Sequence, residues 1–317
     1  MPRILLVKTS SLGDVVHNLP VASDIAARVP GVSVDWVVEE SFAGLPRLNR
    51  AVTRVIPLAI RRWRQSWWRT EGRREVSAFV DELRQTRYDA VIDTQGLLKS
   101  AIVTRAAYGT RYGYDWASAR EPLSFFYDRT FRVPRGAPAV ERNRTLASLA
   151  LSYALPSAVD YGLAAEGHSR LLRERYAVLV HATSADAKLW RDERWAALGN
   201  RLHSAGVRSL LPWGSPAEQR RSEKLSRSIE GAMIMPRLPL GDLSSVLADA
   251  ECVIGVDTGL THLAGALGIP TVGVYTSTDP ALTGLYGCAR AANVGGRGQM
   301  PDADTVLREV ERLRGGG

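Results

Sequence analysis

The stretch from residue 252 to residue 275 constrains the fold most strongly, because it has the pattern of two buried strands joined by a short helix. Its apolar runs at 252–256 and 271–275 have the length of strands, and between them lie a turn at 257–259 and a helical segment at 260–267. Strands joined by such a crossover run parallel. The sequence therefore predicts an α/β protein whose ligands bind at the carboxyl ends of its strands.

The turn after the first of these strands carries groups suited to an anionic, sugar-bearing ligand. Thr258 and Gly259 present backbone N–H groups at a helix N-terminus, which favours an anion such as a pyrophosphate, and Gly259 has no side chain to keep a ligand away. Asp257 could accept hydrogen bonds from sugar hydroxyls, and His262 could donate one. The alternative is structural: Asp257 and Thr258 cap the helix, and His262 is a satisfied surface residue.

Strands and helices alternate along both halves of the chain, which is the pattern of doubly wound parallel sheets. The remaining strands are expected at 3–8, 32–38, 52–58, 89–93, 176–181 and 207–211. The remaining helices are expected at 15–28, 73–85, 139–151, 190–202, 218–229 and 303–313, and residues 112–120 have a loop's composition.

A chain of 317 residues suits two domains. Residues 155–162 have the composition of a linker, so the predicted domains are 1–160 and 161–317. The sequence leaves open whether the last helix packs on the second domain or back on the first.

The loop after the first strand lacks the usual nucleotide-binding fingerprints. It contains a single glycine, Gly13, and neither the G-x-G-x-x-G pattern nor a P-loop lysine, which disfavours a dinucleotide-binding protein or an ordinary NTPase. Ser10, Ser11 and Asp14 are its polar residues. Two interpretations of Asp14 stay open, a helix cap and a carboxylate base beside a cleft.

Composition and charge narrow the kind of partner. The chain is 45% hydrophobic and 23% charged, as is typical of a soluble globular protein, and its two cysteines fit a reducing cytosol. The net charge of +8 favours an anionic partner, whether nucleic acid, a phosphorylated metabolite or an acidic lipid surface. No signal peptide or membrane-spanning run is expected, so any membrane contact would be peripheral.

One segment, residues 61–74, is unusually rich in arginine and tryptophan, with six arginines and three tryptophans in fourteen residues. Guanidinium groups bind phosphates, and tryptophan favours membrane interfaces or stacks on sugars and cations. A solvated charge run is the ordinary alternative. Nucleic-acid binding also fits the composition, but no nucleic-acid-binding motif accompanies the segment.

Several motifs, taken together and in order, resemble those of the lipopolysaccharide heptosyltransferases, which belong to the ADP-heptose family of glycosyltransferases. The resemblance spans nearly the whole chain and is carried by the segments 8–14, 59–64, 93–100, 181–184 with 188–190, 211–216 and 256–262. It implies a GT-B fold, two Rossmann-like domains with the active site between them. It also implies inverting transfer of L-glycero-D-manno-heptose from ADP-heptose to the inner Kdo of Kdo-lipid A.

The resemblance further implies a role for individual residues, with the first domain binding the acceptor and the second the ADP-sugar. Asp14 would be the general base, and Lys188 would face the donor phosphates during catalysis. The residues expected to bind the donor are Ser10, Ser11, Thr183, Ser184, Lys188, Glu218, Leu238, Asp257, Thr258, Gly259 and His262. Those expected to bind the anionic acceptor are Arg61, Arg62, Arg64, Gln95, Lys99 and Arg120. Ser184 and Leu238 stand where the family commonly has threonine and methionine.

The chemistry agrees with a single base. A nucleotide diphosphate leaves as a stable anion, so no second carboxyl group is needed to protonate it, as a glycoside hydrolase would require. No Asp-x-Asp metal motif directly follows a predicted strand, so Lys188 and the helix end at Thr258 and Gly259 are the candidates for stabilising the diphosphate. No metal or cofactor is expected. ADP-heptose would be the donor substrate and the enzyme a monomer, with no nucleic-acid partner.

An anionic membrane is the remaining expected partner, because lipid A is a membrane lipid. The enzyme is expected to be cytoplasmic and peripheral on the inner membrane of a Gram-negative bacterium.

Three alternatives remain. The first is a heptosyltransferase that adds to an already heptosylated acceptor; the Arg61–Arg64 cluster favours the first transfer, because Kdo carboxylates and lipid A phosphates need cations. The second is a nucleotide-sugar epimerase of GT-B type. The third is a basic binding protein without catalysis, whose binding would weaken with salt and ignore ADP.

Overall fold

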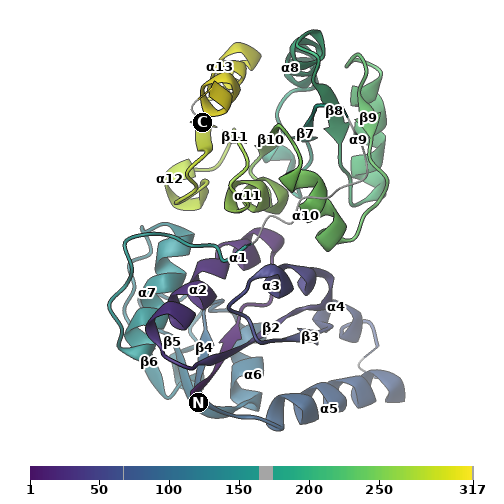
Figure 1. The fold of residues 1–317 in the computed structure, drawn as a ribbon. Helices are drawn as coiled ribbons and strands as arrows, with labels where there is room; N and C mark the ends of the chain where they lie inside the picture. Colours follow the sequence, from purple (N-terminus) through teal and green to yellow (C-terminus); the bar gives the residue numbers. More distant parts are fainter. Residues whose placement is uncertain (67, 164–173, 316–317) are drawn as a thin grey trace. The chain divides into compact units, whose positions relative to one another are not determined.

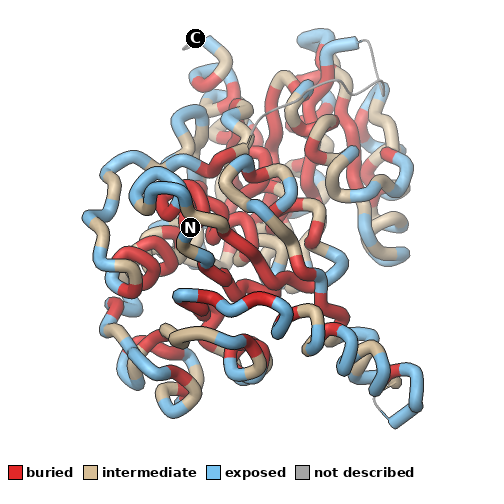
Figure 2. The backbone as a smooth tube through the Cα atoms, turned by 60° about the horizontal axis from the view of Figure 1, so that its bottom comes forward, coloured by how far each residue is buried: buried red, intermediate tan, exposed pale blue. Residues whose placement is uncertain are grey.

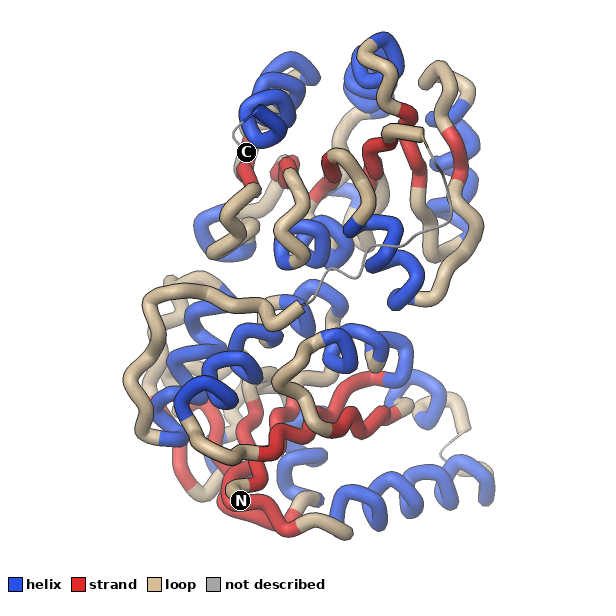
Figure 3. The backbone as a smooth tube through the Cα atoms, viewed as in Figure 1, coloured by secondary structure: helices blue, strands red, loops and turns tan. Residues whose placement is uncertain are grey.

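The computed structural model describes residues 1–66, 68–163 and 174–315, which fall into two compact units, Met1–Leu163 and Ala164–Gly317. Each unit is built on its own sheet of six parallel strands, with helices on both faces of the sheet (Figures 1 and 3). The fold is therefore α/β in both units, as predicted from the alternation of strands and helices.

The first unit has the strand order β3-β2-β1-β4-β5-β6. Its strands are β1 (Arg3–Val7), β2 (Ser33–Glu39), β3 (Arg54–Leu58), β4 (Arg87–Asp93), β5 (Tyr108–Tyr114) and β6 (Arg129–Phe131). Its helices are α1 (Leu12–Val16), α2 (Leu19–Arg28), α3 (Gly44–Leu48), α4 (Ile60–Trp63), α5 (Thr70–Arg84), α6 (Leu98–Ala106) and α7 (Ala139–Leu151), with short 3-10 turns η1 (Glu40–Phe42) and η2 (Ser124–Phe126).

The second unit repeats this order as β12-β11-β10-β7-β8-β9. Its strands are β7 (Tyr176–Val180), β8 (Arg208–Leu211), β9 (Met233–Ile234), β10 (Cys252–Val256), β11 (Thr271–Tyr275) and β12 (Ala291–Gly295). Its helices are α8 (Asp192–Ser204), α9 (Pro216–Ser226), α10 (Leu240–Ala248), α11 (Gly259–Ala266), α12 (Pro280–Thr283) and α13 (Ala303–Gly315), with the 3-10 turn η3 (Asp186–Lys188).

Burial explains why the central strands are almost wholly apolar. Helices cover both faces of each sheet, so neither face of a central strand meets water. In β1, Leu5, Leu6 and Val7 are all fully buried, and the strands form the buried red centre of the first unit in Figure 2. On one face of this sheet α5 and α6 pack through residues such as Phe79 and Val103.

The strand order of each unit fixes where polar loops meet. In both sheets the chain winds outward from a central pair, β1 and β4 in the first unit and β7 and β10 in the second. At such a switch point the loops after the two strands diverge to opposite faces, and ligands bind in the crevice between them. The loops after β1, β4, β7 and β10 are therefore where each unit can hold a ligand.

Two local predictions were wrong, and each has a physical reason. The expected helix 15–28 is broken into α1 and α2 because Pro20, in the first turn of α2, cannot continue a helix from α1. Residues 108–114 form strand β5 rather than starting a loop at 112. One of the two glycines within it, Gly113, is needed because a Cβ there would lie 2.4 Å from the Tyr127 ring.

The expected linker 155–162 lies directly before the boundary between the two units and packs on the first unit. Asn49 donates a hydrogen bond to the Tyr161 carbonyl (2.9 Å), and Asn49 forms a β-bridge with Leu163. Residues 164–173, which follow, lie outside the described residues.

The last helix, α13, packs within the second unit. Its buried residues Val306, Val310 and Leu313 belong to the apolar core that also contains residues of α8 and β11. None of the helices that the structure describes combines the length and apolar character needed to span a bilayer.

A buried ion pair joins α2 to α7 and yields a stability prediction. The Arg144 guanidinium donates to both oxygens of Asp24 (2.7 and 3.1 Å), and both side chains are almost fully buried. Asp24→Asn leaves the guanidinium buried without a counter-charge, so we expect the free energy of unfolding to fall by about 3–5 kcal/mol in urea denaturation followed by tryptophan fluorescence.

The matched control is Asp160→Asn, which removes the carboxylate of the exposed Arg50–Asp160 pair. It should cost less than about 1 kcal/mol. Equal losses in the two variants would contradict a special contribution from the buried pair.

Candidate active site

A pocket opens in the first unit at the carboxyl ends of β1 and β4, its switch point. It is lined by residues from α1, β5 and α7 and from the loops after β1, β4 and β5, namely Lys8, Asp14, Thr94, Gln95, Gly96, Tyr114, Ser118, Arg120, Ala139, Arg142 and Asn143. Three arginine or lysine side chains and one carboxylate thus face one small space, which suits an anionic ligand carrying a hydroxyl group.

Asp14 lies in the first turn of α1, not on the loop where it was predicted. Its Oδ2 accepts hydrogen bonds from the Ser11 backbone N–H (3.0 Å) and the Ser11 hydroxyl (3.1 Å). Burial raises the pKa of Asp14, but the Lys8 ammonium and the Ser11 N–H outweigh it and lower the pKa below its usual value. The carboxylate is therefore charged at neutral pH.

The two interpretations of Asp14 that the sequence left open are compatible. As a capping residue it uses Oδ2 alone. Within the described part of the chain, Oδ1 accepts no hydrogen bond; its contact is the ion pair with Lys8 Nζ at 4.0 Å. One oxygen thus holds the helix end while the other stays available to a ligand.

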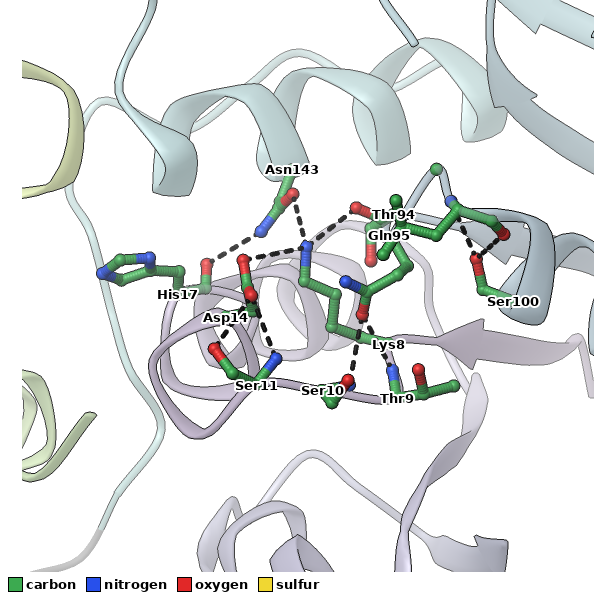
Figure 4. Close-up of polar contacts among 12 residues, drawn as sticks. Lys8, Thr9, Ser10, Ser11, Asp14, His17, Thr94, Gln95, Ser100 and Asn143 are labelled. Carbon is green, nitrogen blue, oxygen red and sulfur yellow. Dashed lines mark hydrogen bonds and ion pairs between the residues drawn. The ribbon is translucent and has the colours of Figure 1, made fainter. Parts of the chain in front are cut away.

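Lys8, at the end of β1, is the buried cation of this pocket. Its ammonium donates to the Thr94 carbonyl (2.9 Å) and to Asn143 Oδ1 (3.5 Å), as Figure 4 shows. Burial lowers the pKa of Lys8, and Asp14 acts in the opposite direction. The sequence placed Lys8 in a motif but assigned it no role.

The polar residues around Asp14 tie the loops of the switch point together. Gln95 is buried, and its Oε1 accepts from the backbone N–H groups of Thr9 (3.1 Å) and Ser10 (3.2 Å). Lys99 donates to the Ser10 hydroxyl. Burial lowers the pKa of Lys99. Gln95 and Ser10, predicted to bind acceptor and donor, thus both contribute to the shape of the loop.

The predicted acceptor-binding arginines differ in whether a carboxylate of the protein already pairs with their guanidinium group. Arg62 is paired with Glu40 (3.1 Å) and with Glu75. Arg61 lies over the Phe42 ring (5.5 Å). In the described ranges neither Arg61 nor Arg64 forms an ion pair through its side chain, and both are exposed.

Arg120 follows β5 and reaches the pocket. It is exposed, and its charge acts on both Asp14 and Lys8. No ion pair is found for it among the residues that the structure describes, so its guanidinium can bind an anion.

The tryptophans of segment 61–74 do not act as one group. Trp63 packs on Phe79 of α5 (ring centroids 5.4 Å apart) and donates from Nε1 to Glu75 (2.9 Å), so it belongs to the fold. Trp68 is 56% exposed. Trp67 lies outside the described residues.

In the second unit, Asp257 joins the loops at the ends of β7, β10 and β11. Its Oδ2 accepts from Lys188 Nζ (2.8 Å) and from the Thr278 hydroxyl (2.8 Å), and its Oδ1 lies 3.3 Å from His262 Nε2. Burial raises the pKa of Asp257, but His262 and Lys188 together lower it well below its usual range. Asp257 is therefore a charged anchor that positions Lys188 and His262.

The N-terminus of α11 begins directly after Asp257. Thr258 is the N-cap residue and forms no side-chain capping bond, and the hydrogen bonds of Asp257 go to other side chains. Thr258 therefore stands at the cap position without a side-chain capping bond, and His262 is buried and not, as the structural alternative had it, on the surface. Thr261 in the first turn donates to the Val256 carbonyl (2.7 Å), and a Cβ at Gly255 would lie 2.1 Å from its hydroxyl oxygen.

The other donor-binding residues predicted in the second unit lie on the loops after β7 and β9 and in helix α9, which follows β8. The Thr183 hydroxyl donates to the Asp257 carbonyl (3.3 Å), while Ser184 is exposed. Glu218, in the first turn of α9, accepts from the backbone N–H groups of Gly214 (2.6 Å) and Ser215 (3.0 Å) through Oε2. Leu238 is half-buried before α10.

Sequence reasoning missed several residues of the two sites. Thr94, Tyr114, Arg142 and Asn143 line the first pocket, and Thr278 contacts Asp257. Thr278 could have been predicted from the sequence, because it follows the buried strand β11, which pairs with β10. Asn143 did not, because nothing in the pattern of α7 indicates which polar residue faces inward. No group of three or more His, Cys, Asp or Glu side chains in the described residues is placed to hold a metal ion.

Comparison with known proteins places the chain among glycosyltransferases. Residues 76–310 match the protein family described as "Glycosyltransferase family 9 (heptosyltransferase)". Lipopolysaccharide heptosyltransferase 1 of Escherichia coli (strain K12) is 46% identical over 290 residues, which cover 90% of this chain and 91% of that protein.

Two solved structures extend the similarity to the fold. E. coli heptosyltransferase WaaC with ADP has a TM-score of 0.91 and 43% identity, covering 98% of this chain and 99% of that chain. The structure of WaaC with ADP-2-deoxy-2-fluoro heptose has a TM-score of 0.86 and 42% identity, with the same coverage of 98% and 99%. These similarities confirm the predicted fold class, two Rossmann-like doubly wound domains of the GT-B type.

Proposed function

Because the chain belongs to glycosyltransferase family 9, the heptosyltransferases, we propose that it transfers L-glycero-D-manno-heptose from ADP-heptose to the inner Kdo of Kdo-lipid A. This reaction builds the core of lipopolysaccharide. The motif resemblance had indicated the same family. The donor is supported by the similarity over the whole chain to an enzyme crystallised with an ADP-heptose analogue.

The observation that carries the proposal is the free oxygen of Asp14 in a cationic pocket. Asp14 Oδ1 accepts the proton of the acceptor hydroxyl. The acceptor oxygen then forms a bond to the anomeric carbon of heptose while the bond from that carbon to the diphosphate breaks, and its electron pair leaves with ADP. Kdo carries a carboxylate, for which Arg120 and Arg142 at the pocket are suitable partners.

The second unit supplies the stabilisation of the leaving group. An ammonium has three donors, and Asp257 uses one of those of Lys188, so the others can bind diphosphate oxygens. The N–H groups at the start of α11, which the Thr258 side chain does not cap, add favourable charge for the same anion. Glu218 has a second carboxylate oxygen to accept from the ribose hydroxyls.

The acceptor also determines where the enzyme works. Lipid A is a membrane lipid with phosphate groups, and the exposed cations of segment 61–74 together with a net charge of +8 suit an anionic lipid surface. We place the enzyme, as a monomer, peripherally on the cytoplasmic face of the inner membrane.

A direct assay of acceptors tests the function. The enzyme with ADP-heptose should transfer heptose to Kdo-lipid A with a kcat/KM about a hundredfold or more above that for an already heptosylated acceptor, because the pocket cations lose their anionic partner in the latter. Preference for the heptosylated acceptor would instead indicate the second transferase of the pathway. Conversion of the sugar in ADP-heptose alone, without acceptor, would indicate an epimerase.

Asp14→Asn tests the base, since the amide keeps the size and can still accept from Ser11. We expect kcat to fall by roughly 10²- to 10⁴-fold, the usual contribution of a general base, while ADP binds with unchanged affinity in calorimetry. If ADP binding were lost with activity, Asp14 would be structural.

Lys188→Ala tests the stabilisation of the diphosphate. We expect kcat to fall by roughly 10²-fold or more, because a preorganised donor at a developing charge contributes about that much. The double variant Lys188→Ala with Asp257→Asn separates the causes, since it removes the uncompensated carboxylate as well. Near-normal turnover in Lys188→Ala, or recovery in the double variant, would remove Lys188 from the chemistry.

A further inference from the structure

The buried ammonium of Lys8 is the part of the first pocket that the proposed reaction leaves without a role. The Lys8 side chain is 6% exposed and the Asp14 side chain 25%. A buried charge is retained only when other groups satisfy it. Lys8 is satisfied by the Thr94 carbonyl, the Asn143 amide oxygen and the Asp14 carboxylate.

Asn143 fixes the ammonium from the opposite side. Its Nδ2 donates to the His17 carbonyl (3.3 Å), which orients the amide so that Oδ1 accepts from Lys8 and from the Tyr114 hydroxyl (3.2 Å). Figure 4 shows this chain of contacts from α7 to Lys8 and on to Asp14. The ammonium is thereby held by groups from β4 and α7, and α1 is tied to the same network.

The separation of 4.0 Å between Lys8 Nζ and Asp14 Oδ1 is the informative quantity. It is too long for a hydrogen bond, so Oδ1 keeps its capacity to accept a proton. It is short enough for a strong charge interaction in a buried site. The cation therefore favours the ionised carboxylate without occupying the oxygen that reacts.

We propose that Lys8 is a positioning residue for the catalytic base: it keeps Asp14 ionised in mildly acidic solution and sets the lower pH limit of heptose transfer. This inference rests on the proposed role of Asp14 as the base. In this role Lys8 acts through Asp14 and not on the reacting atoms.

Other charged groups face the same pair, and each comes from a different element. Asp14 is also influenced by Arg120 after β5, by His17 at the end of α1 and by Lys99 of α6. Lys8 is also influenced by Asp93 at the end of β4 and by Arg142 of α7. Arg120 is exposed to water, which screens its charge, so Lys8 is the dominant cation for Asp14.

The sign of the effect follows directly. The cation lowers the pKa of Asp14, so its removal raises that pKa and the base becomes protonated, and inactive, at a higher pH. An opposite charge at this range shifts a carboxyl pKa by about 1–3 units.

The test is the pH profile of kcat/KM for Lys8→Met, which preserves side-chain volume. We expect its acid limb to move upward by about 1–3 pH units relative to the unmodified enzyme, while Lys8→Arg, which keeps the charge, shows no such shift. Lys224→Met, at an exposed lysine in the second unit, controls for the loss of one positive charge and should leave the limb in place. An unshifted acid limb in Lys8→Met would overturn the proposal.

Two further measurements separate other causes. The pH profiles with and without Lys8→Met are compared again in a His17→Gln background, so that titration of the His17 imidazole cannot produce the acid limb. A shift that vanishes in this background contradicts the role of Lys8. If Lys8→Met is too slow to profile, carbon-13 NMR titration of the Asp14 carboxyl, assigned by its absence in Asp14→Asn, decides directly: an unchanged pKa rejects the proposal.

Failure of this inference is distinguishable from failure of the proposed base. An active Asp14→Asn enzyme would refute the base itself, whereas an inactive Asp14→Asn enzyme with an unshifted Lys8→Met profile refutes only the role of Lys8.

Discussion

Each unit holds a lysine–aspartate pair at the carboxyl ends of its central strands, and the need to satisfy these partly buried charges organises both sites. In the second unit Lys188 and Asp257 are in direct contact at 2.8 Å, and Thr278 and His262 complete the carboxylate's partners. In the first unit the ammonium of Lys8 stops at 4.0 Å from Asp14. Attraction between charges is strong in partly buried sites, but only the longer pair leaves a carboxylate oxygen without a hydrogen bond within the described residues.

Asp14 and Glu218 show how one carboxyl group can serve both fold and chemistry. Each lies in the first turn of a helix that follows a strand of the sheet, and each uses one oxygen to accept backbone N–H groups at the helix start. Such a contact fixes the side chain at little cost, because the helix end needs an acceptor in any case. The second oxygen is then presented in a fixed direction. A capping role and a ligand-binding role are therefore complementary at these positions.

This dual use explains what the sequence could and could not predict. Strands β10 and β11 and helix α7 were predicted with their observed bounds or very close to them, because burial on both sheet faces demands continuous apolar runs and an amphipathic pattern marks the helix. Asp14 and Asp257 were identified because they follow such strands. The contact between Lys8 and Asn143 was out of reach, since these residues are 135 positions apart and no local pattern links them. The break before Pro20 was readable but was outweighed by helical spacing.

The arginine-rich segment shows why net charge is a poor measure of a binding surface. Arg62 is held by Glu40 and Glu75, so an incoming phosphate would have to displace a carboxylate to reach it, and its charge mainly fastens α4 to α5. Arg64 and Arg120 carry no ion pair within the described residues and can meet an anion at no such cost. Exposed guanidinium groups of this kind attract anionic lipid over a distance that the salt concentration limits. Arg120 lines the pocket, where a guanidinium group can bind an anion by direct hydrogen bonds. Under the proposed function, recognition of the acceptor would therefore divide between long-range attraction by segment 61–74 and short-range selection by cations such as Arg120 that form no ion pair within the described residues.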